Sequence, residues 1–146
     1  MEKHESSYNL FDWWKKAVFQ NYANFNGRAR RSEYWYFILV NIILIVPLYI
    51  VSIIGVANDS TGLTVLGFSL CGLFVIGLII PWLAVVVRRL HDLNKSGWNY
   101  FIRLIPIVGP IILLVWLCTD GDSFTNNYGD DPKNPGTPEF DFEQKN

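Results

Sequence analysis

The sequence predicts an all-α fold: a polytopic membrane protein with about three transmembrane helices, preceded by an N-terminal amphipathic interfacial helix. Residues 34–58 are 25 consecutive positions without an acid or a base, and residues 60–87 are another 28. A hydrocarbon core about 30 Å thick needs roughly 20 helical residues, so both runs are long enough to cross it. Only 17% of the residues are charged and 51% are hydrophobic, which leaves too little polar sequence to cover two such helices in a soluble domain.

The first segment, residues 1–33, is basic and contains the expected interfacial helix over residues 8–23. Apolar side chains recur there at helical spacing, with charged and amide side chains on the other side. The apolar positions are Leu10, Phe11, Trp14, Val18 and Tyr22. Asn9 is the expected N-cap, with Asp12 three positions later. Aromatic rings opposite lysines suit the headgroup boundary, although an amphipathic helix packed on another protein surface has the same pattern.

A transmembrane domain follows over residues 34–119, with its three spans expected at 34–56, 63–87 and 98–118. The first span opens with an aromatic cluster of the kind found at membrane interfaces, and Pro47 should kink it. The third span is interrupted by Arg103 and must bend near Pro106 and Pro110. As a helix it would still reach about 31 Å, which is enough to cross.

The distribution of lysine and arginine predicts the orientation of these spans. Six bases precede the first span, none lies in the link between the first two spans, and three lie in the loop 88–97. We therefore expect the N-terminus and this loop on the cytoplasmic side, and the C-terminus on the extracytoplasmic side. The tail, residues 120–146, is acidic and rich in Asp, Asn, Gly and Pro, and is expected to be largely disordered.

Three short motifs carry a resemblance to a known family. Residues 26–35 read NGRARRSEYW, residues 88–98 read RRLHDLNKSGW, and residues 127–132 read NYGDDP. In these motifs the chain resembles the bacterial YhaH/YhaI-like inner-membrane family, a domain of unknown function (DUF805). The resemblance runs from about residue 10 to residue 132 and implies a small bacterial inner-membrane protein. It implies no particular activity.

The candidate site comprises the polar and aromatic residues of the first two motifs, which should meet at one membrane face. These residues are Arg28, Arg30, Arg31, Glu33, Trp35, Arg88, Arg89, His91, Asp92, Lys95, Gly97 and Trp98. The bases alone would be explained by the orientation signal that polytopic proteins carry. The acids among them lead to a further hypothesis, that Glu33 and Asp92 pair with arginines of the opposite segment and hold the first span to the loop.

Two polar residues inside the predicted spans form a second candidate. Asn41 and Arg103 lie at comparable depth on the same side of the membrane, so a contact between them is expected. An arginine at the centre of a bilayer costs about 3 kcal/mol on insertion scales. The alternative is that Arg103 extends its side chain towards the headgroups.

No cofactor or metal is predicted. His91 beside Asp92 is too small a ligand set for a closed metal site, and a structural role in the loop explains both residues, with Ser96 capping the next helix. Cys71 and Cys118 fall in apolar stretches and suggest packing, not a disulfide. The sequence contains no glycine-rich phosphate loop, nucleophile elbow or paired-cysteine zinc spacing.

The function predicted from these features is that of a non-enzymatic membrane interaction module. Its partners would be the lipid bilayer, through anionic headgroups, or a second membrane protein, which includes a further copy of the chain. The alternative is a subunit of a small oligomeric transporter or channel, since three spans are too few to enclose a pathway. A membrane enzyme ranks third, with only His91, Asp92 and Glu33 as candidate groups. Nucleic acid is not expected as a partner, because the bases lie against the membrane.

Overall fold

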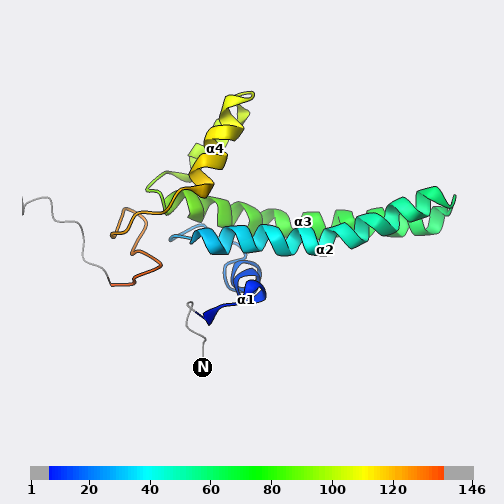
Figure 1. Ribbon diagram of the computed structural model, residues 1–146, viewed down its shortest axis with the longest axis horizontal. Helices are drawn as coiled ribbons and strands as arrows, with labels where there is room; N and C mark the ends of the chain where they lie inside the picture. Colours follow the sequence, from blue (N-terminus) through cyan, green and yellow to red (C-terminus); the bar gives the residue numbers. More distant parts are fainter. Residues whose placement is uncertain (1–6, 137–146) are drawn as a thin grey trace, which may run out of the picture.

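The computed structural model describes residues 7–136, and over this range the chain is helical. The elements are α1 (Leu10–Lys15), the π-helical turn η2 (Lys16–Gln20), α2 (Arg31–Ala57), α3 (Thr61–His91), the 3-10 helix η3 (Gly97–Leu104) and α4 (Val108–Cys118). Figure 1 shows α2 and α3 side by side along the long axis, with the other elements gathered at one end of this pair. Within the described range, β-type pairing is confined to an isolated bridge between Asn126 and Gly129.

Within the described range, α2 and α3 are the two helices that are long and apolar enough to cross a membrane. At 1.5 Å per residue, the 27 residues of α2 extend about 40 Å and the 31 residues of α3 about 46 Å. The predicted spans 34–56 and 63–87 lie within them, and both helices continue through an internal proline, Pro47 in α2 and Pro81 in α3.

The two long helices approach most closely near the link that joins them. A Cβ added to Gly67 of α3 would lie 2.8 Å from the backbone nitrogen of Ser52 in α2, and one added to Gly55 would lie 2.8 Å from Thr64 Oγ1. Ser52 is fully buried and its hydroxyl donates to the Leu48 carbonyl 3.0 Å away. Small residues therefore allow backbone contact here, as is common between helices in membranes.

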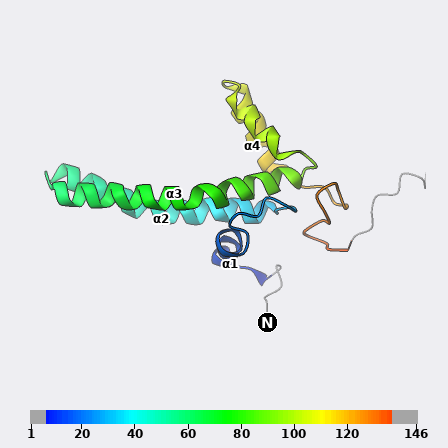
Figure 2. The same cartoon turned by 180° about the vertical axis from the view of Figure 1, so that it is seen from behind.

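The third apolar segment is not one continuous helix: the predicted span 98–118 is divided into η3 and α4, so a third crossing is not confirmed. Ser96 caps η3 as expected, since its hydroxyl accepts from the Trp98 N–H at 3.4 Å. The chain then reverses at Pro106 and Ile107, where φ of Ile107 is +66°, and α4 returns alongside η3. Gly109 permits this return, because a Cβ there would lie 2.8 Å from the carbonyl carbon of Ile102. The result is a hairpin that points away from α2 and α3 (Figure 2).

The reversal places the C-terminal segment at the end of the molecule where α2 begins and α3 ends. The Asp122 N–H donates to the Asp92 carbonyl at 2.9 Å, and Arg28 contacts carbonyls of residues 122–129. These contacts hold part of the tail, residues 122–129, against Arg28, whereas the sequence led us to expect a largely disordered tail on the other side of the membrane. Residues 137–146 of the predicted disordered tail lie outside the described residues.

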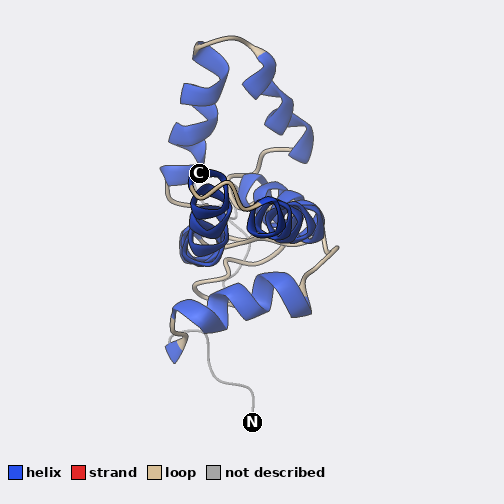
Figure 3. Ribbon diagram, turned by 90° about the vertical axis from the view of Figure 1, so that its right-hand side faces the viewer, coloured by secondary structure: helices blue, strands red, loops and turns tan. Residues whose placement is uncertain are grey.

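The N-terminal helix packs across α2 and α3 on the side opposite the hairpin (Figure 3). Asn9 is its N-cap, as predicted, in a capping box with Asp12. The buried positions are Trp13 and Ala17, whereas Phe11 is 55% exposed, so the packed face is centred about one residue away from the predicted stripe. The N-terminal helix therefore packs on other elements of the same chain. The hydrophobic core lies at this end of the α2–α3 pair, with η2 on one side and α4 on the other, and comprises Ala17, Ala29, Tyr34, Phe37, Val85, Val86, Leu90, Leu113 and Leu117.

Two side chains of this N-terminal segment contact polar groups of the long helices. Trp14 Nε1 donates to Asn41 Oδ1 at 2.9 Å, which satisfies the one amide side chain in the middle of α2. The Tyr22 hydroxyl donates to the Gly77 carbonyl at 2.8 Å. That carbonyl has lost its helical donor, because the residue four positions later is Pro81, which has no N–H. Tyr22 therefore replaces a hydrogen bond that the proline removes.

Candidate functional site

The candidate site is a group of buried charges at the end of the molecule where all segments converge. We call it the polar cap. It consists of Lys16, Arg28, Arg30, Arg31, Glu33, Arg88, Arg89, His91, Asp92 and residues 119–133. The sequence folds this way locally because α2 begins at Arg31 and α3 ends at His91, so the two basic motifs occupy adjacent helix ends.

Asp92 is at the centre of the polar cap and joins two arginines. Arg28 Nε donates to Asp92 Oδ1 at 2.9 Å, and Arg89 Nη1 donates to Asp92 Oδ2. Side-chain exposure is 1% for Arg28, 0% for Arg89 and 4% for Asp92. Burial raises the pKa of Asp92, and the hydrogen bond from Arg28 and the charge of Arg89 act against that rise. With two guanidinium partners, the carboxylate serves as a fixed anion that neutralises them in part.

Arg28 and Arg89 also bind backbone carbonyls of the segments that follow the hairpin. Arg28 Nη1 donates to the Phe124 carbonyl at 2.7 Å and to the Gly129 carbonyl at 3.2 Å, and its Nη2 donates to the Asp122 carbonyl. Arg89 donates to the carbonyls of Leu117 and Thr119. It thereby satisfies carbonyls at the C-terminus of α4, where a cation is favourable. The two arginines therefore order residues 117–129 by charge-assisted hydrogen bonds.

Glu33 forms a second buried cluster, in the first turn of α2. Its Oε1 lies 2.7 Å from Arg88 Nη1 and its Oε2 lies 3.2 Å from Lys16 Nζ, and both Glu33 and Arg88 are nearly inaccessible. The pairing predicted for Glu33 and for Asp92 with arginines of the opposite segment is therefore present in both cases. Lys16 was not predicted, and it adds the N-terminal helix to the contact between α2 and α3.

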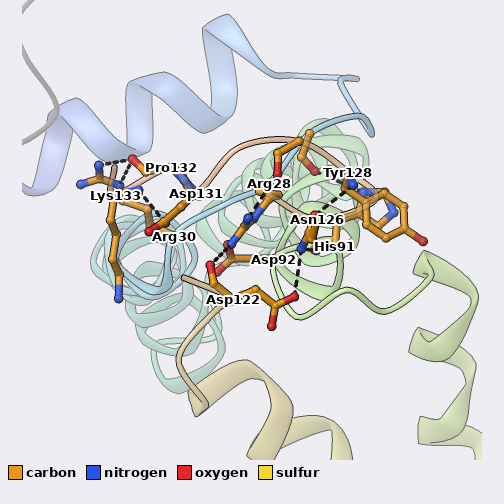
Figure 4. A network of polar contacts seen from close by, with 12 residues as sticks. Arg28, Arg30, His91, Asp92, Asp122, Asn126, Tyr128, Asp131, Pro132 and Lys133 are labelled. Atoms are coloured by element: carbon orange, nitrogen blue, oxygen red, sulfur yellow. Dashed lines mark hydrogen bonds and ion pairs between the residues drawn. The ribbon is translucent and has the colours of Figure 1, made fainter. Parts of the chain in front are cut away.

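His91 joins the end of α3 to the segments before α2 and after the hairpin. Its Nδ1 lies 3.2 Å from the Gly27 carbonyl, and its ring stacks on Tyr128 with centroids 3.8 Å apart (Figure 4). Asn126 Nδ2 donates to the His91 carbonyl at 3.0 Å. Within residues 7–136, no three His, Cys, Asp or Glu side chains gather as a metal site would require.

Arg30 and Arg31 bind the same C-terminal segment nearer the surface. Arg30 Nε donates to the Pro132 carbonyl at 2.8 Å, and its guanidinium lies 5.8 Å from the ring centroid of Trp13. Arg31 donates to the Cys118 carbonyl at 3.1 Å and pairs with Asp120 at 2.6 Å. A hydrogen bond from Lys133 lowers the pKa of Asp120, whose side chain is 58% exposed.

The remaining residues of the predicted site lie at the border between the polar cap and the apolar surface. Lys95 Nζ lies 4.7 Å from the ring centroid of Trp116, which ties the loop to α4. Gly97 packs against Val87, where a Cβ would lie 2.8 Å from a methyl carbon. Trp98 is 79% exposed and Trp35 is 39% exposed.

The predicted contact between Asn41 and Arg103 is not made. Asn41 accepts from Trp14, and Arg103 lies on the hairpin, where it donates to the Tyr100 hydroxyl and stacks over that ring at 5.0 Å. The prediction placed both residues on crossing helices, and the reversal at Ile107 removes one of the two. Arg103 is exposed at the side of the hairpin, so its charge avoids the cost of burial between α2 and α3.

Sequence reasoning missed the backbone carbonyls that receive most of the arginine hydrogen bonds. It also missed Gly121, where a Cβ would lie 2.6 Å from Asp92 Oδ1, so that only glycine allows the chain to pass the carboxylate this closely. A signal was available in the third motif: polar turn residues at 127–132 are unusual in a tail without structure. Carbonyl acceptors leave no trace in a sequence, because every residue has one.

These observations define the class of protein: a helical integral membrane protein whose charges are gathered in one internally paired cap at the end of two long apolar helices. The chain belongs to the family described as "Protein of unknown function (DUF805)", whose profile matches residues 22–130. It is 41% identical over 120 residues to inner membrane protein YhaI of Escherichia coli, covering 82% of this chain and 95% of that protein. It is also 41% identical over 124 residues to inner membrane protein YhaH of the same organism, covering 84% and 97%. No solved structure matches the fold.

Proposed function

We propose that this protein is a non-enzymatic interaction module of the bacterial inner membrane that binds anionic phospholipid headgroups beside its polar cap. The observation that carries the proposal is the pair of lateral extensions at this end: α1 with η2 on one side of the long helices, and the η3–α4 hairpin on the other (Figure 3). Each extension combines exposed aromatic rings with an exposed base. This combination suits the headgroup region, where rings are partly dry and cations meet anionic lipid.

The first extension offers Lys15 between two exposed rings. Phe11 is 55% exposed and Phe19 is 71% exposed, and Lys15 is exposed on the same short helical segment. The second extension offers Arg103 with Trp98 and Phe101. A base close to an anionic membrane surface contributes about 1 kcal/mol of attraction, so the two extensions together supply about 2 kcal/mol.

The buried arginines of the polar cap have a different role in this proposal. Arg28, Arg88 and Arg89 are nearly inaccessible and are engaged by carboxylates or carbonyls, which makes them unsuited to bind headgroups. They hold the two extensions and the C-terminal segment in a fixed arrangement. Lipid binding is thus assigned to Lys15 and Arg103, and not to the motif arginines.

The transporter alternative has less support. Most outward-facing side chains of α2 and α3 are aliphatic or aromatic, such as Ile43, Ile53, Leu73 and Ile76, each about half exposed or more. A water-filled pathway between copies of this chain would need polar groups along these sides.

Native mass spectrometry of the gently extracted protein tests both functions, because it reports bound lipids and subunits together. With added phosphatidylglycerol, we expect lipid-bound peaks, and the affinity at each extension should fall about fivefold in the Lys15→Gln/Arg103→Gln variant, because each site loses about 1 kcal/mol. Phosphatidylcholine should bind weakly to both proteins. The control is Lys133→Gln, which removes an exposed base of the polar cap away from the extensions. Equal phosphatidylglycerol binding by the wild type and the double variant would refute the proposal.

A further inference from the structure

We infer that the η3–α4 hairpin enters the membrane leaflet next to the polar cap and returns to the same side, so that the chain crosses the membrane twice and residues 119–136 are cytoplasmic. The partner of the hairpin is the hydrocarbon of that leaflet. This inference concerns the apolar tip of the hairpin and the side on which the chain emerges, and it does not depend on headgroup binding. Arg103, next to Leu104 of the tip, would extend its side chain back to the headgroups.

Neither arm of the hairpin is long enough to cross. The eight residues of η3 extend about 16 Å at 2.0 Å per residue, and the 11 residues of α4 extend about 16 Å at 1.5 Å per residue. Each length is about half of a 30 Å hydrocarbon core. Figure 1 also shows the hairpin pointing away from α2 and α3, not running beside them as a third crossing helix would.

Both ends of the hairpin are fastened to the polar cap. At the start, the Lys95 N–H donates to the Leu90 carbonyl at 3.0 Å, between Arg89 and His91 of the polar cap. At the end, Arg89 binds the Thr119 carbonyl, and Arg28 binds the Phe124 carbonyl five residues further on. Contacts between residues 28 and 124 require both segments on one side of the bilayer, since hydrogen bonds cannot join groups separated by its core.

The tip of the hairpin is apolar and exposed. Exposure is 73% for Leu104, 80% for Ile107 and 54% for Val108. The irregular backbone at the tip keeps few free donors: the Ile105 N–H bonds the Ile102 carbonyl at 3.0 Å, the Val108 N–H bonds the Pro106 carbonyl at 2.7 Å, and Pro106 has no N–H. Each bonded donor removes several kcal/mol from the cost of placing this backbone against hydrocarbon.

The positions of the lysines and arginines determine on which side of the membrane the polar cap lies. All the arginines and lysines that flank α2 and α3 lie at the polar cap, whereas the link between these helices carries none. Because positively charged flanks remain in the cytoplasm, the polar cap is cytoplasmic and the link is extracytoplasmic. The segment that Arg28 binds is then cytoplasmic too.

Single-cysteine labelling of the full chain in its membrane tests the inference. In a Cys71→Ala/Cys118→Ala background, one cysteine is introduced at the link (Asn58→Cys), after the hairpin (Ser123→Cys) or at the tip (Val108→Cys), all exposed positions. A charged, membrane-impermeant maleimide is added to spheroplasts and, separately, to inverted vesicles. Thermal unfolding in detergent shows that each variant is folded.

We expect Asn58→Cys to react only in spheroplasts and Ser123→Cys to react only in inverted vesicles. Val108→Cys should resist the reagent on both sides and react once the membrane is dissolved in SDS. Reaction of Ser123→Cys in spheroplasts would overturn the two-crossing arrangement. Rapid reaction of Val108→Cys from either side would show that the tip is in water, and efficient cross-linking between two Val108→Cys chains would show that a second copy covers it; each result would overturn hydrocarbon as the partner.

Discussion

The two ends of the α2–α3 pair are held together by opposite kinds of interaction. At the polar cap, Asp92 and Glu33 pair with three arginines and a lysine, and nearly all of these side chains are buried. At the far end, the helices meet through Gly55 and Gly67 without a charged group between them.

The difference follows from the surroundings of each end. In hydrocarbon, apolar side chains gain little by leaving lipid for another helix, so close backbone contact through small residues has to provide the association. At the polar cap water is near, and segments without regular structure must be fixed. Charged side chains do this, because one guanidinium binds several carbonyls at once. The polar cap therefore orders loops, whereas the glycine contact orders helices.

The largest effect is expected from removing the charge of Asp92. Asp92→Asn leaves Arg28 and Arg89 buried next to each other without their shared anion. Removing one partner of a buried ion pair costs about 3–5 kcal/mol, so the free energy of unfolding should fall by about that amount. SDS titration of the detergent-solubilised protein, followed by tryptophan fluorescence, measures it. A loss no greater than that of Asp120→Asn would mean that the polar cap is not held by this pair.

A smaller loss is expected at the glycine contact. Gly67→Ala introduces a Cβ only 2.8 Å from the Ser52 nitrogen, so α2 and α3 must separate, and overpacking of this kind costs about 1–3 kcal/mol. The same titration measures the change. Gly72→Ala is the matched control on the same helix, since a Cβ there meets nothing within 4 Å. That control should be neutral or slightly stabilising, because alanine favours helix. Equal losses in both variants would refute the close contact.

Between the two ends, the hydrogen bond from Tyr22 to Gly77 should contribute about 1 kcal/mol. Tyr22→Phe leaves the Gly77 carbonyl without a donor. In a Pro81→Ala background, however, the helix regains an N–H for that carbonyl, so the effect of Tyr22→Phe should shrink. A double-mutant cycle on unfolding free energies tests this coupling. Losses that simply add in the double variant would show that Tyr22 and Pro81 act independently.

The smallest effect is expected from Asp120→Asn. This carboxylate pairs with Arg31 and Lys133 at the exposed edge of the polar cap, where water and salt weaken the interaction. The hydrogen bond from Lys133 lowers the pKa of Asp120. The contribution of Asp120 to the free energy of unfolding is therefore fully present at pH values above the ordinary pKa of an aspartate. It is lost as the pH falls through the lowered pKa. Thermal unfolding at neutral pH should change little; a loss comparable to that of Asp92→Asn would contradict the distinction between buried and exposed pairs.

The sequence predicted the two long helices and the acid–arginine pairing at their adjacent ends. Charge-free length is a local property, and residues 33 and 88–92 are brought together as soon as two antiparallel helices are assumed. The third segment was predicted as one helix because its composition is apolar over 98–118, whereas the structure divides it at a reversal that depends on three positions. Pro106 removes a donor, Ile107 adopts a left-handed backbone conformation, and Gly109 allows the arms to touch.

By itself, the sequence determined that this chain has long apolar helices of membrane-spanning length and which ends of those helices carry charge, because hydropathy and charge act over short stretches. Only the tertiary structure decided where the chain goes afterwards. The return of residues 119–132 to Arg28 rests on backbone carbonyls that every residue possesses, and on the close passage of Gly121 beside Asp92. Acceptors common to all residues become specific only when folding places them within reach of a particular guanidinium.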